Sequence, residues 1–209
     1  MSESLNYGAL PHNSMTLTGQ GQVTTVPDLA VIRLGVQSTG SDLEATQAEN
    51  SQISQEILDA LMEMGVTDIK TFQYTIDKFY EQVNGNTVDR GYTIRHIFEI
   101  RTEEMGNIGE IIDTAVNAGA NIVDLISFEV SNPNLYYEQA LNIAVMNAIE
   151  KAKSIARNLN IKINPIPIKI TENSFVPRPF QSFQRELAAT PIVPGNIMIE
   201  AMVTAEFEY

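Results

Sequence analysis

The longest helical pattern in the sequence carries an alanine at every fourth position. Asn132-Pro133-Asn134 opens this pattern, which predicts a helix over residues 134–159. Residues four apart lie on one face of a helix, so the alanines form a continuous ridge: Ala140, Ala144, Ala148, Ala152 and Ala156. A ridge of small side chains lets a helix approach a sheet or another helix closely. We expect close packing within the chain, and dimerisation through the ridge is the open alternative.

The remaining periodic segments predict two more helices and a set of strands. Strand-like alternation runs from Thr16 to Val36, and Pro27-Asp28 interrupts it, which indicates a bend or a tight hairpin. The predicted helices span residues 42–64, behind a capping box of Ser41 and Glu44, and residues 105–118. The predicted strands span residues 69–80, 91–101, 121–131, 166–172 and 196–208. The turn sequence Asn84-Gly85-Asn86 predicts that the first two form a hairpin.

This order of elements predicts an α+β fold, with a largely antiparallel sheet and three helices on one face. It lacks the regular alternation of strand and helix that is typical of doubly wound proteins. We expect residues 1–15 to form a flexible tail and residues 16–209 to form the folded domain. Within that domain, residues 68–132 are a candidate β-β-α-β subdomain.

The charge balance excludes two classes of partner. The chain has 13 basic and 26 acidic residues, a formal net charge of −13. Such a field repels phosphate, so we expect neither nucleic acid nor a membrane as a partner. The N-terminus lacks the basic and apolar regions of a secretory signal, and no stretch of the sequence is apolar enough to cross a bilayer. On these grounds the sequence predicts a cytoplasmic protein.

Groups that could perform chemistry are scarce. The chain has no cysteine and only two histidines, His12 in the tail and His96 in a predicted strand. His96 shares a face with Tyr92 and Phe98, so we interpret it as a packed residue with a local hydrogen bond. The alternative is a small-molecule binder or hydrolase with a pocket near Tyr92 and His96. The lone Gly19-Gln20-Gly21 lacks the third glycine and the following helix of a dinucleotide loop. We predict no catalytic residue, metal or cofactor.

The segment 173–191 is the candidate interaction site. Connections of this length are usually functional or disordered, and this one combines three phenylalanines with two arginines in an acidic chain: Phe175, Arg178, Phe180, Phe183 and Arg185. Aromatic and arginine side chains are typical anchors of protein interfaces. In the alternative interpretation, the phenylalanines cover the chain's own core.

Short motifs and single residues follow one another in a fixed order from residue 16 to residue 208. They are Gly19 and Gly21, Pro27-Asp28, Ala45, Asn50, Gly65, Thr71, Tyr74, Tyr80, Gly91-Tyr92, Gly119-Ala120-Asn121, Phe128, Lys151-Ala152-Lys153, and Pro191-Ile192 with Pro194-Gly195. This ordered set resembles the SIMPL domain family, a group of unknown function with YggE-like and periplasmic immunogenic protein-like members.

The resemblance implies an α+β fold of two interleaved sandwich sub-structures and a tendency to form ring-like or channel-like homo-oligomers. It also implies links to stress tolerance and to signalling through protein contacts, and it supplies no catalytic residues. Many bacterial members carry an export signal, which is not found at the start of this sequence. The sequence therefore predicts a homo-oligomeric scaffold or protein-interaction module, with a further protein partner, rather than an enzyme.

Overall fold

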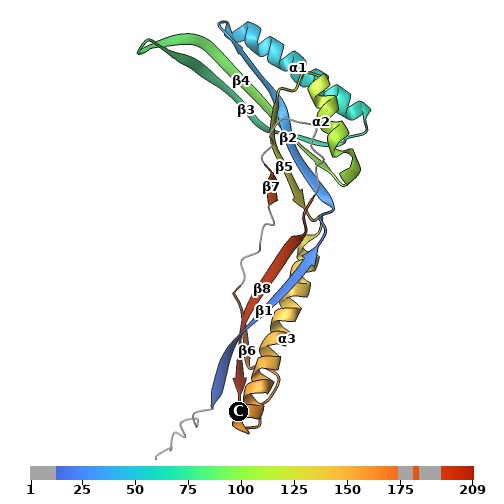
Figure 1. Cartoon of the computed structure of the whole chain (residues 1–209), viewed down its shortest axis with the longest axis vertical. Helices are drawn as coiled ribbons and strands as arrows, with labels where there is room; N and C mark the ends of the chain where they lie inside the picture. The colour runs from blue at the N-terminus through green and yellow to red at the C-terminus, as the bar shows by residue number, and fades with distance from the viewer. Residues whose placement is uncertain (1–12, 174–180, 184–193) are drawn as a thin grey trace, which may run out of the picture. The chain divides into compact units, whose positions relative to one another are not determined.

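A computed structural model describes residues 13–173, 181–183 and 194–209 (Figure 1). The described chain divides into two compact units that interleave along the sequence. The first contains residues 13–25, 132–173 and 198–209, and the second contains residues 26–131, 181–183 and 194–197. The α+β prediction is confirmed, because the described residues form three α-helices and two antiparallel sheets.

The first unit packs one long helix against a three-stranded sheet. The strand order is β1-β8-β6, with β1 at Ser14–Thr25, β8 at Ile197–Glu208 and β6 at Lys169–Glu172. Helix α3 spans Pro133–Leu159 and is capped by Asn132, whose side chain accepts a hydrogen bond from the amide of Leu135 at 3.3 Å. The core joins four alanines of α3 to alternate residues of β8: Ala201, Val203, Ala205 and Phe207.

The alanine ridge of α3 lies directly over two glycines of β1. A Cβ atom placed on Gly19 would lie 2.0 Å from the carbonyl oxygen of Ala144, and one on Gly21 would lie 1.9 Å from that of Ala140. Only glycine permits so close an approach of backbone to backbone. The predicted close packing is confirmed. Because Ala140 and Ala144 are fully buried by the chain's own sheet, they are not available to a second helix.

The second unit is a five-stranded sheet with the order β3-β4-β2-β5-β7. The strands are β2 (Leu29–Gly40), β3 (Asp68–Val83), β4 (Asn86–Thr102), β5 (Ile122–Glu129) and β7 (Gln181–Phe183). The helices are α1 (Leu43–Glu63) and α2 (Ile108–Asn117), preceded by a short 3-10 turn, η1 (Met105–Asn107). The candidate subdomain, residues 68–132, falls in this unit except for its last residue, Asn132, which belongs to the first unit; the second unit also contains β2 and α1.

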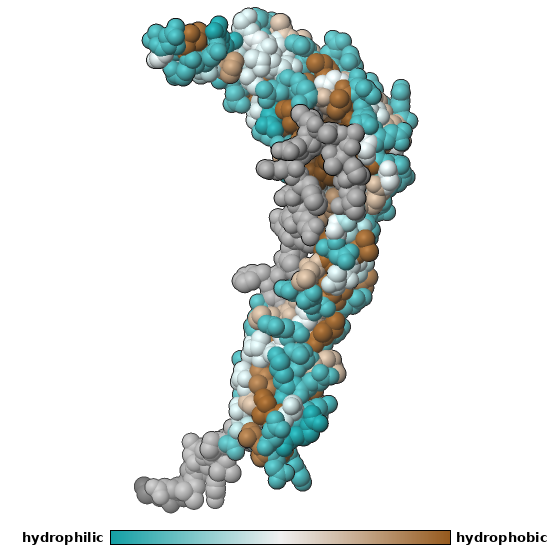
Figure 2. All heavy atoms as spheres, in the orientation of Figure 1, coloured by the Kyte–Doolittle hydropathy of each residue, from teal (hydrophilic) through white to brown (hydrophobic). Residues whose placement is uncertain are grey.

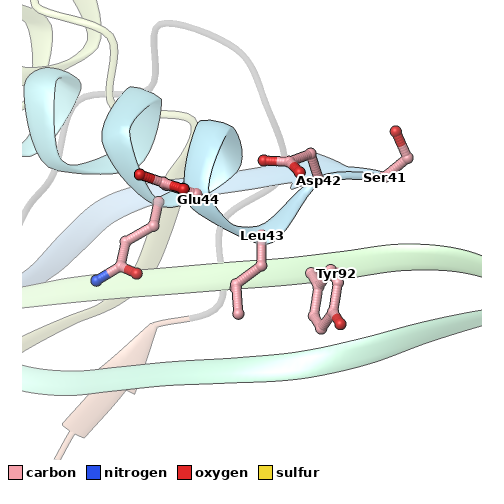
Figure 3. Close-up of a pocket in the computed structure, with 6 residues that line it drawn as sticks. Ser41, Asp42, Leu43, Glu44 and Tyr92 are labelled. Atoms are coloured by element: carbon pink, nitrogen blue, oxygen red, sulfur yellow. The ribbon is translucent and has the colours of Figure 1, made fainter.

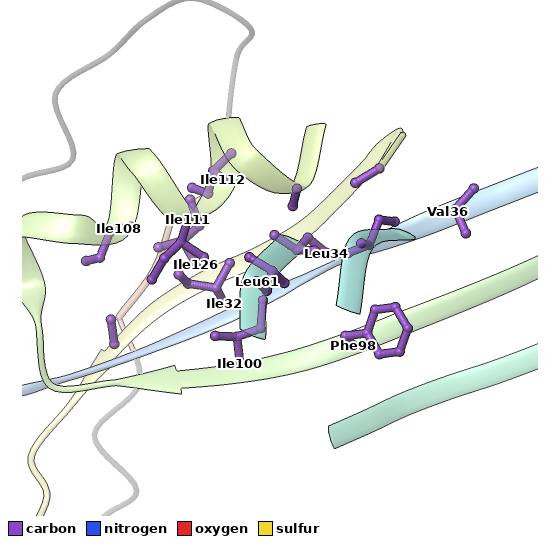
Figure 4. Close-up of a cluster of buried hydrophobic side chains, with 14 of the residues drawn as sticks. Ile32, Leu34, Val36, Leu61, Phe98, Ile100, Ile108, Ile111, Ile112 and Ile126 are labelled. Carbon is purple, nitrogen blue, oxygen red and sulfur yellow. The ribbon is translucent and has the colours of Figure 1, made fainter. Parts of the chain in front are cut away.

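The core of the second unit lies between the sheet and its two helices (Figure 4). Ile32 and Leu34 of β2, Phe98 of β4 and Leu61 of α1 are all buried there. Asn50 is a fully buried polar residue of α1. Its Nδ2 donates to the carbonyl oxygens of Ile94 and Val36 at 3.2 and 3.4 Å and to the hydroxyl of Ser38 at 3.3 Å, so it ties the helix to two strands.

The other face of this sheet carries a ladder of ion pairs. Arg33 donates to Glu99 Oε2 from Nε at 2.9 Å and from Nη2 at 2.8 Å. Arg101 donates to Glu99 Oε1 at 3.4 Å and to Glu129 at 3.1 Å. The ladder thus joins β2, β4 and β5 through half-buried side chains, where charges are less screened than on an open surface.

The structure corrects three local predictions. Of the two alternatives for Pro27-Asp28, the tight hairpin is wrong, because β1 pairs in the first unit and β2 pairs with β4 and β5 in the second. Helix α1 is capped by Asp42, whose Oδ1 accepts from the amide of Ala45 at 2.8 Å, rather than by Ser41. The predicted helix 105–118 is divided into η1 and α2.

The predicted hairpin of β3 and β4 is confirmed, and its turn residues Asn84 and Gly85 have φ values of 51° and 82°. Among the described residues, none of the helices combines the length and the apolar character needed to span a bilayer.

Candidate functional site

Four of the residues predicted to form an interaction loop lie outside the described part of the chain: Phe175, Arg178, Phe180 and Arg185. Phe183 belongs to β7, where its backbone pairs opposite Ile126 of β5. The role of this segment in binding stays a prediction.

His96 lies in β4 under α1 and is surrounded by hydrogen-bond partners and rings. Its Nδ1 lies 3.0 Å from the hydroxyl of Ser54, and its Nε2 lies 3.1 Å from the hydroxyl of Thr71. The ring meets Tyr74 edge-on at 5.1 Å between centroids and Phe98 at 4.3 Å. Burial lowers the pKa of His96 below its usual 6.5, so the ring is held neutral. The prediction of a packed histidine is confirmed.

A hollow of about 430 Å³ lies beside Tyr92, at the start of α1 (Figure 3). Its other lining residues come from the helix N-terminus: Ser41, Asp42, Leu43, Glu44 and Gln47. His96 is not among them, so the two residues of the small-molecule alternative are not brought into one hollow. Asp42 is engaged in capping the helix, because its Oδ1 accepts from the amide of Ala45.

Metal-binding geometry is likewise not seen in the described ranges. Across residues 13–173, 181–183 and 194–209, no three histidine, aspartate or glutamate side chains gather closely enough to hold an ion. His12 lies outside these ranges.

The candidate site supported by the structure is the outer edge of β3, the edge strand of the second sheet. This strand is 16 residues long and pairs with β4 on one side. No other described strand pairs with its outer side. It carries exposed large apolar side chains along most of its length, from 41% exposed at Ile76 to 55% at Tyr80: Phe72, Tyr74, Ile76, Phe79 and Tyr80. Figure 2 shows apolar side chains among hydrophilic ones at the surface of this hairpin.

A bulge distributes these side chains over both faces of the sheet. The register of β3 on β4 shifts between Thr71 and Gln73, and Phe72 is the extra residue. Tyr74 contacts His96 on the helix-covered face, whereas the Phe72 ring lies 3.6 Å beneath the guanidinium of Arg33 on the other face. Apolar side chains of the edge therefore lie on both faces of the sheet.

Alternation in the sequence predicts that Phe72, Tyr74 and Ile76 share one face of a strand, which is wrong because the bulge turns Phe72 to the other face. The sequence did not identify that strand as a binding edge. The available signal was the aromatic density of residues 69–80 together with the length of the hairpin. Which of the two hairpin strands lies at the edge depends on β2 pairing with β4, a contact between distant parts of the sequence.

Comparison with known families and proteins gives one consistent result. Residues 15–207 match the family described as SIMPL, a protein of unknown function (DUF541). The chain is 28% identical to the 26 kDa periplasmic immunogenic protein of Brucella melitensis, over 93% of this chain and 84% of that protein. It is 23% identical to the uncharacterized protein YggE of Edwardsiella ictaluri, over 86% and 77% of the two chains. Against YggE of Escherichia coli K12 it is 23% identical, over 86% and 73%.

These relatives contradict the predicted cytoplasmic location. The Brucella proteins are named as periplasmic, and they align with this sequence over nearly its whole length. The prediction was wrong because it relied on the composition of the first residues, whereas the folded domain carries no physical signature of its compartment.

Proposed function

This chain belongs to the SIMPL family, and from that premise we propose that it acts in the periplasm as a homo-oligomeric scaffold rather than as a catalyst. The observation that carries the proposal is the apolar outer edge of β3. A long edge strand with exposed apolar side chains and unpaired backbone groups is a template for pairing with another chain. Exposed apolar patches on soluble domains commonly mark interaction sites.

The size of the edge indicates what its burial could contribute. Fully burying a large apolar side chain contributes about 1.5–3 kcal/mol. The five side chains of the β3 edge are each about half exposed, so covering them adds about 5 kcal/mol. Association costs about 4–15 kcal/mol in lost freedom. Apolar burial alone is therefore marginal, and a stable contact also needs backbone hydrogen bonds along the strand.

A second apolar patch lies in the first unit, on and before β6. Ile166 is 71% exposed, and Ile168 and Ile170 follow it at alternate positions, also exposed. Strand β6 is an edge strand of its sheet, so it too has an outer side that no described strand covers. Two separate patches per chain allow assemblies larger than a dimer.

The periplasmic location is supported by the name of the Brucella relative. A role in stress tolerance or binding of another protein, both implied by the family resemblance, stays within this proposal as a finer prediction. The segment 173–191 is a further candidate contact, tested by replacing Phe180 and Phe183 with serine.

The proposal is tested by the mass of the full chain in solution. We expect light scattering after gel filtration to give a multiple of 23.1 kDa across the micromolar range. Replacing Phe79 and Tyr80 with serine should lower the mass without changing the far-ultraviolet circular dichroism. Replacing Met62 of α1, which is also an exposed large apolar residue, with serine is the matched control and should leave the mass unchanged. A strict monomer for the unmodified chain would refute the scaffold proposal.

A further inference from the structure

We infer that β3 binds β3 of a second copy, antiparallel, about a two-fold axis that passes beside Tyr74. This inference rests on the proposed function and adds the contact surface and its register. A two-fold contact uses the same surface on both copies, so the edge must be complementary to itself. Whether β3 meets this requirement depends on its charged residues.

The charges of β3 are complementary when the strand is reversed on itself. Lys70 is paired in register with Glu99, and Asp77 is paired with Thr93, so both lie on the face that carries the ion-pair ladder. The bulge at Phe72 adds one residue between Lys70 and Tyr74 without adding a position to the register of β3 on β4. Counted in this register, Lys70 lies three positions from Tyr74 on one side, and Asp77 lies three positions from it on the other.

With the axis at Tyr74, each Lys70 lies directly opposite Asp77 of the second copy, and the contact forms this ion pair twice. Thr71 then lies opposite Ile76, and the two Tyr74 rings meet at the centre. Opposite charges and aromatic pairs directly across two antiparallel strands are stabilising. The reversal also leaves each side chain on its own face, so the combined sheet stays covered by helices on the same side.

The existing partners of the charged residues favour this register over the one centred two residues further along β3. Moving the axis to Ile76 would place Lys70 opposite Glu81, but Arg90 already holds Glu81 at 2.7 Å. Asp77 has no ion-pair partner within the described residues, and Lys70 has only an exposed pair with Asp68 at 3.0 Å. The register centred on Tyr74 therefore supplies a partner to an unpaired carboxylate and disturbs no stronger ion pair.

The chain has no cysteine, so a single introduced cysteine reports the register directly. Residues directly opposite in an antiparallel pair have Cα atoms about 4.5–5.5 Å apart, within the range of a disulfide. Tyr74→Cys in the full chain should form a covalent dimer under mild oxidation. Tyr80→Cys, an exposed aromatic position six residues further on, would place its two sulfurs roughly 40 Å apart and should not cross-link.

A second pair of variants leaves Tyr74 in place, so that it tests the register even where replacing this central tyrosine abolishes binding. Lys70→Cys with Asp77→Cys in one chain should cross-link, because the cysteine at position 70 of each copy lies opposite the cysteine at position 77 of the other copy. Lys70→Cys alone should not, because the two Lys70 positions are far apart. Independently, Asp77→Lys should weaken self-association by roughly tenfold, and adding Lys70→Asp should restore it.

The outcomes separate this inference from the scaffold proposal. Cross-linking of Tyr74→Cys or of the double-cysteine chain, with neither control cross-linked, supports the register. An unmodified chain that is oligomeric, while neither of these variants cross-links, overturns the inference and leaves the scaffold proposal standing. Cross-linking of Tyr80→Cys instead overturns the register, and a monomeric unmodified chain overturns both proposals.

Discussion

Substituting Gly21 with alanine tests how closely α3 approaches β1. The new Cβ would lie 1.9 Å from the carbonyl oxygen of Ala140 and 2.6 Å from the amide nitrogen of Ala144. Both are backbone atoms of α3, so neither can move by changing a rotamer. The helix must shift away from the sheet by about 1.5 Å to restore ordinary carbon–oxygen contact.

That shift sets the magnitude of the effect. A gap of 0.5–1 Å already removes about a quarter to a half of a dispersion contact, and four alanines of the ridge lie in the core between α3 and its sheet. Extra methylene groups in a packed core cost about 1–3 kcal/mol when side chains can adjust. Because here the obstacle is a helix backbone, we expect Gly21→Ala to lower the free energy of unfolding by about 3 kcal/mol or more.

The assay is urea denaturation followed by circular dichroism at the helical band, to which α3 contributes 27 residues. Two substitutions serve as controls. Gln20→Ala changes the exposed neighbour in the same strand and should have little effect. Gly109→Ala in α2 adds a Cβ that meets nothing within 4 Å, and it should stabilise by up to about 1 kcal/mol. A Gly21→Ala protein as stable as the Gln20→Ala protein would refute the close packing of ridge and strand.

Three further predictions concern the second unit. Asn50→Ala removes the buried amide that binds two carbonyl oxygens and should cost about 2 kcal/mol in urea unfolding; an unchanged midpoint would contradict its tying role. Glu99→Gln leaves Arg33 and Arg101 with a weaker partner and should cost about 1 kcal/mol at low salt and less at high salt; a loss independent of salt would count against an electrostatic ladder. The pKa of His96 is lowered by burial in the folded protein, so below pH 6.5 the unfolded chain binds the proton more readily. The free energy of unfolding should therefore fall as pH decreases below 6.5, and His96→Gln should remove that part of the dependence; identical pH slopes for the two proteins would contradict it.

Much of the fold followed from local features of the sequence. The alternation of side chains identified the strands, and Asn84-Gly85 specified the hairpin because both residues adopt the left-handed conformation that this turn requires. The alanine ridge indicated that its helix packs closely. Each of these signals depends on a residue and its near neighbours, so no knowledge of distant contacts was needed to interpret them.

The candidate site followed from the tertiary structure alone. Phe72, Tyr74 and Ile76 have the same pattern that a buried strand would have, and they are exposed because β2 pairs with β4 and leaves β3 at the edge. The same pairing of distant segments placed His96 beneath α1 and kept it out of the hollow beside Tyr92. A local pattern specifies which face of a strand is apolar, whereas the neighbours of that strand are set by contacts between residues far apart in the chain. The sequence by itself therefore determined the elements and their close packing, and the tertiary structure decided which apolar surface was left open.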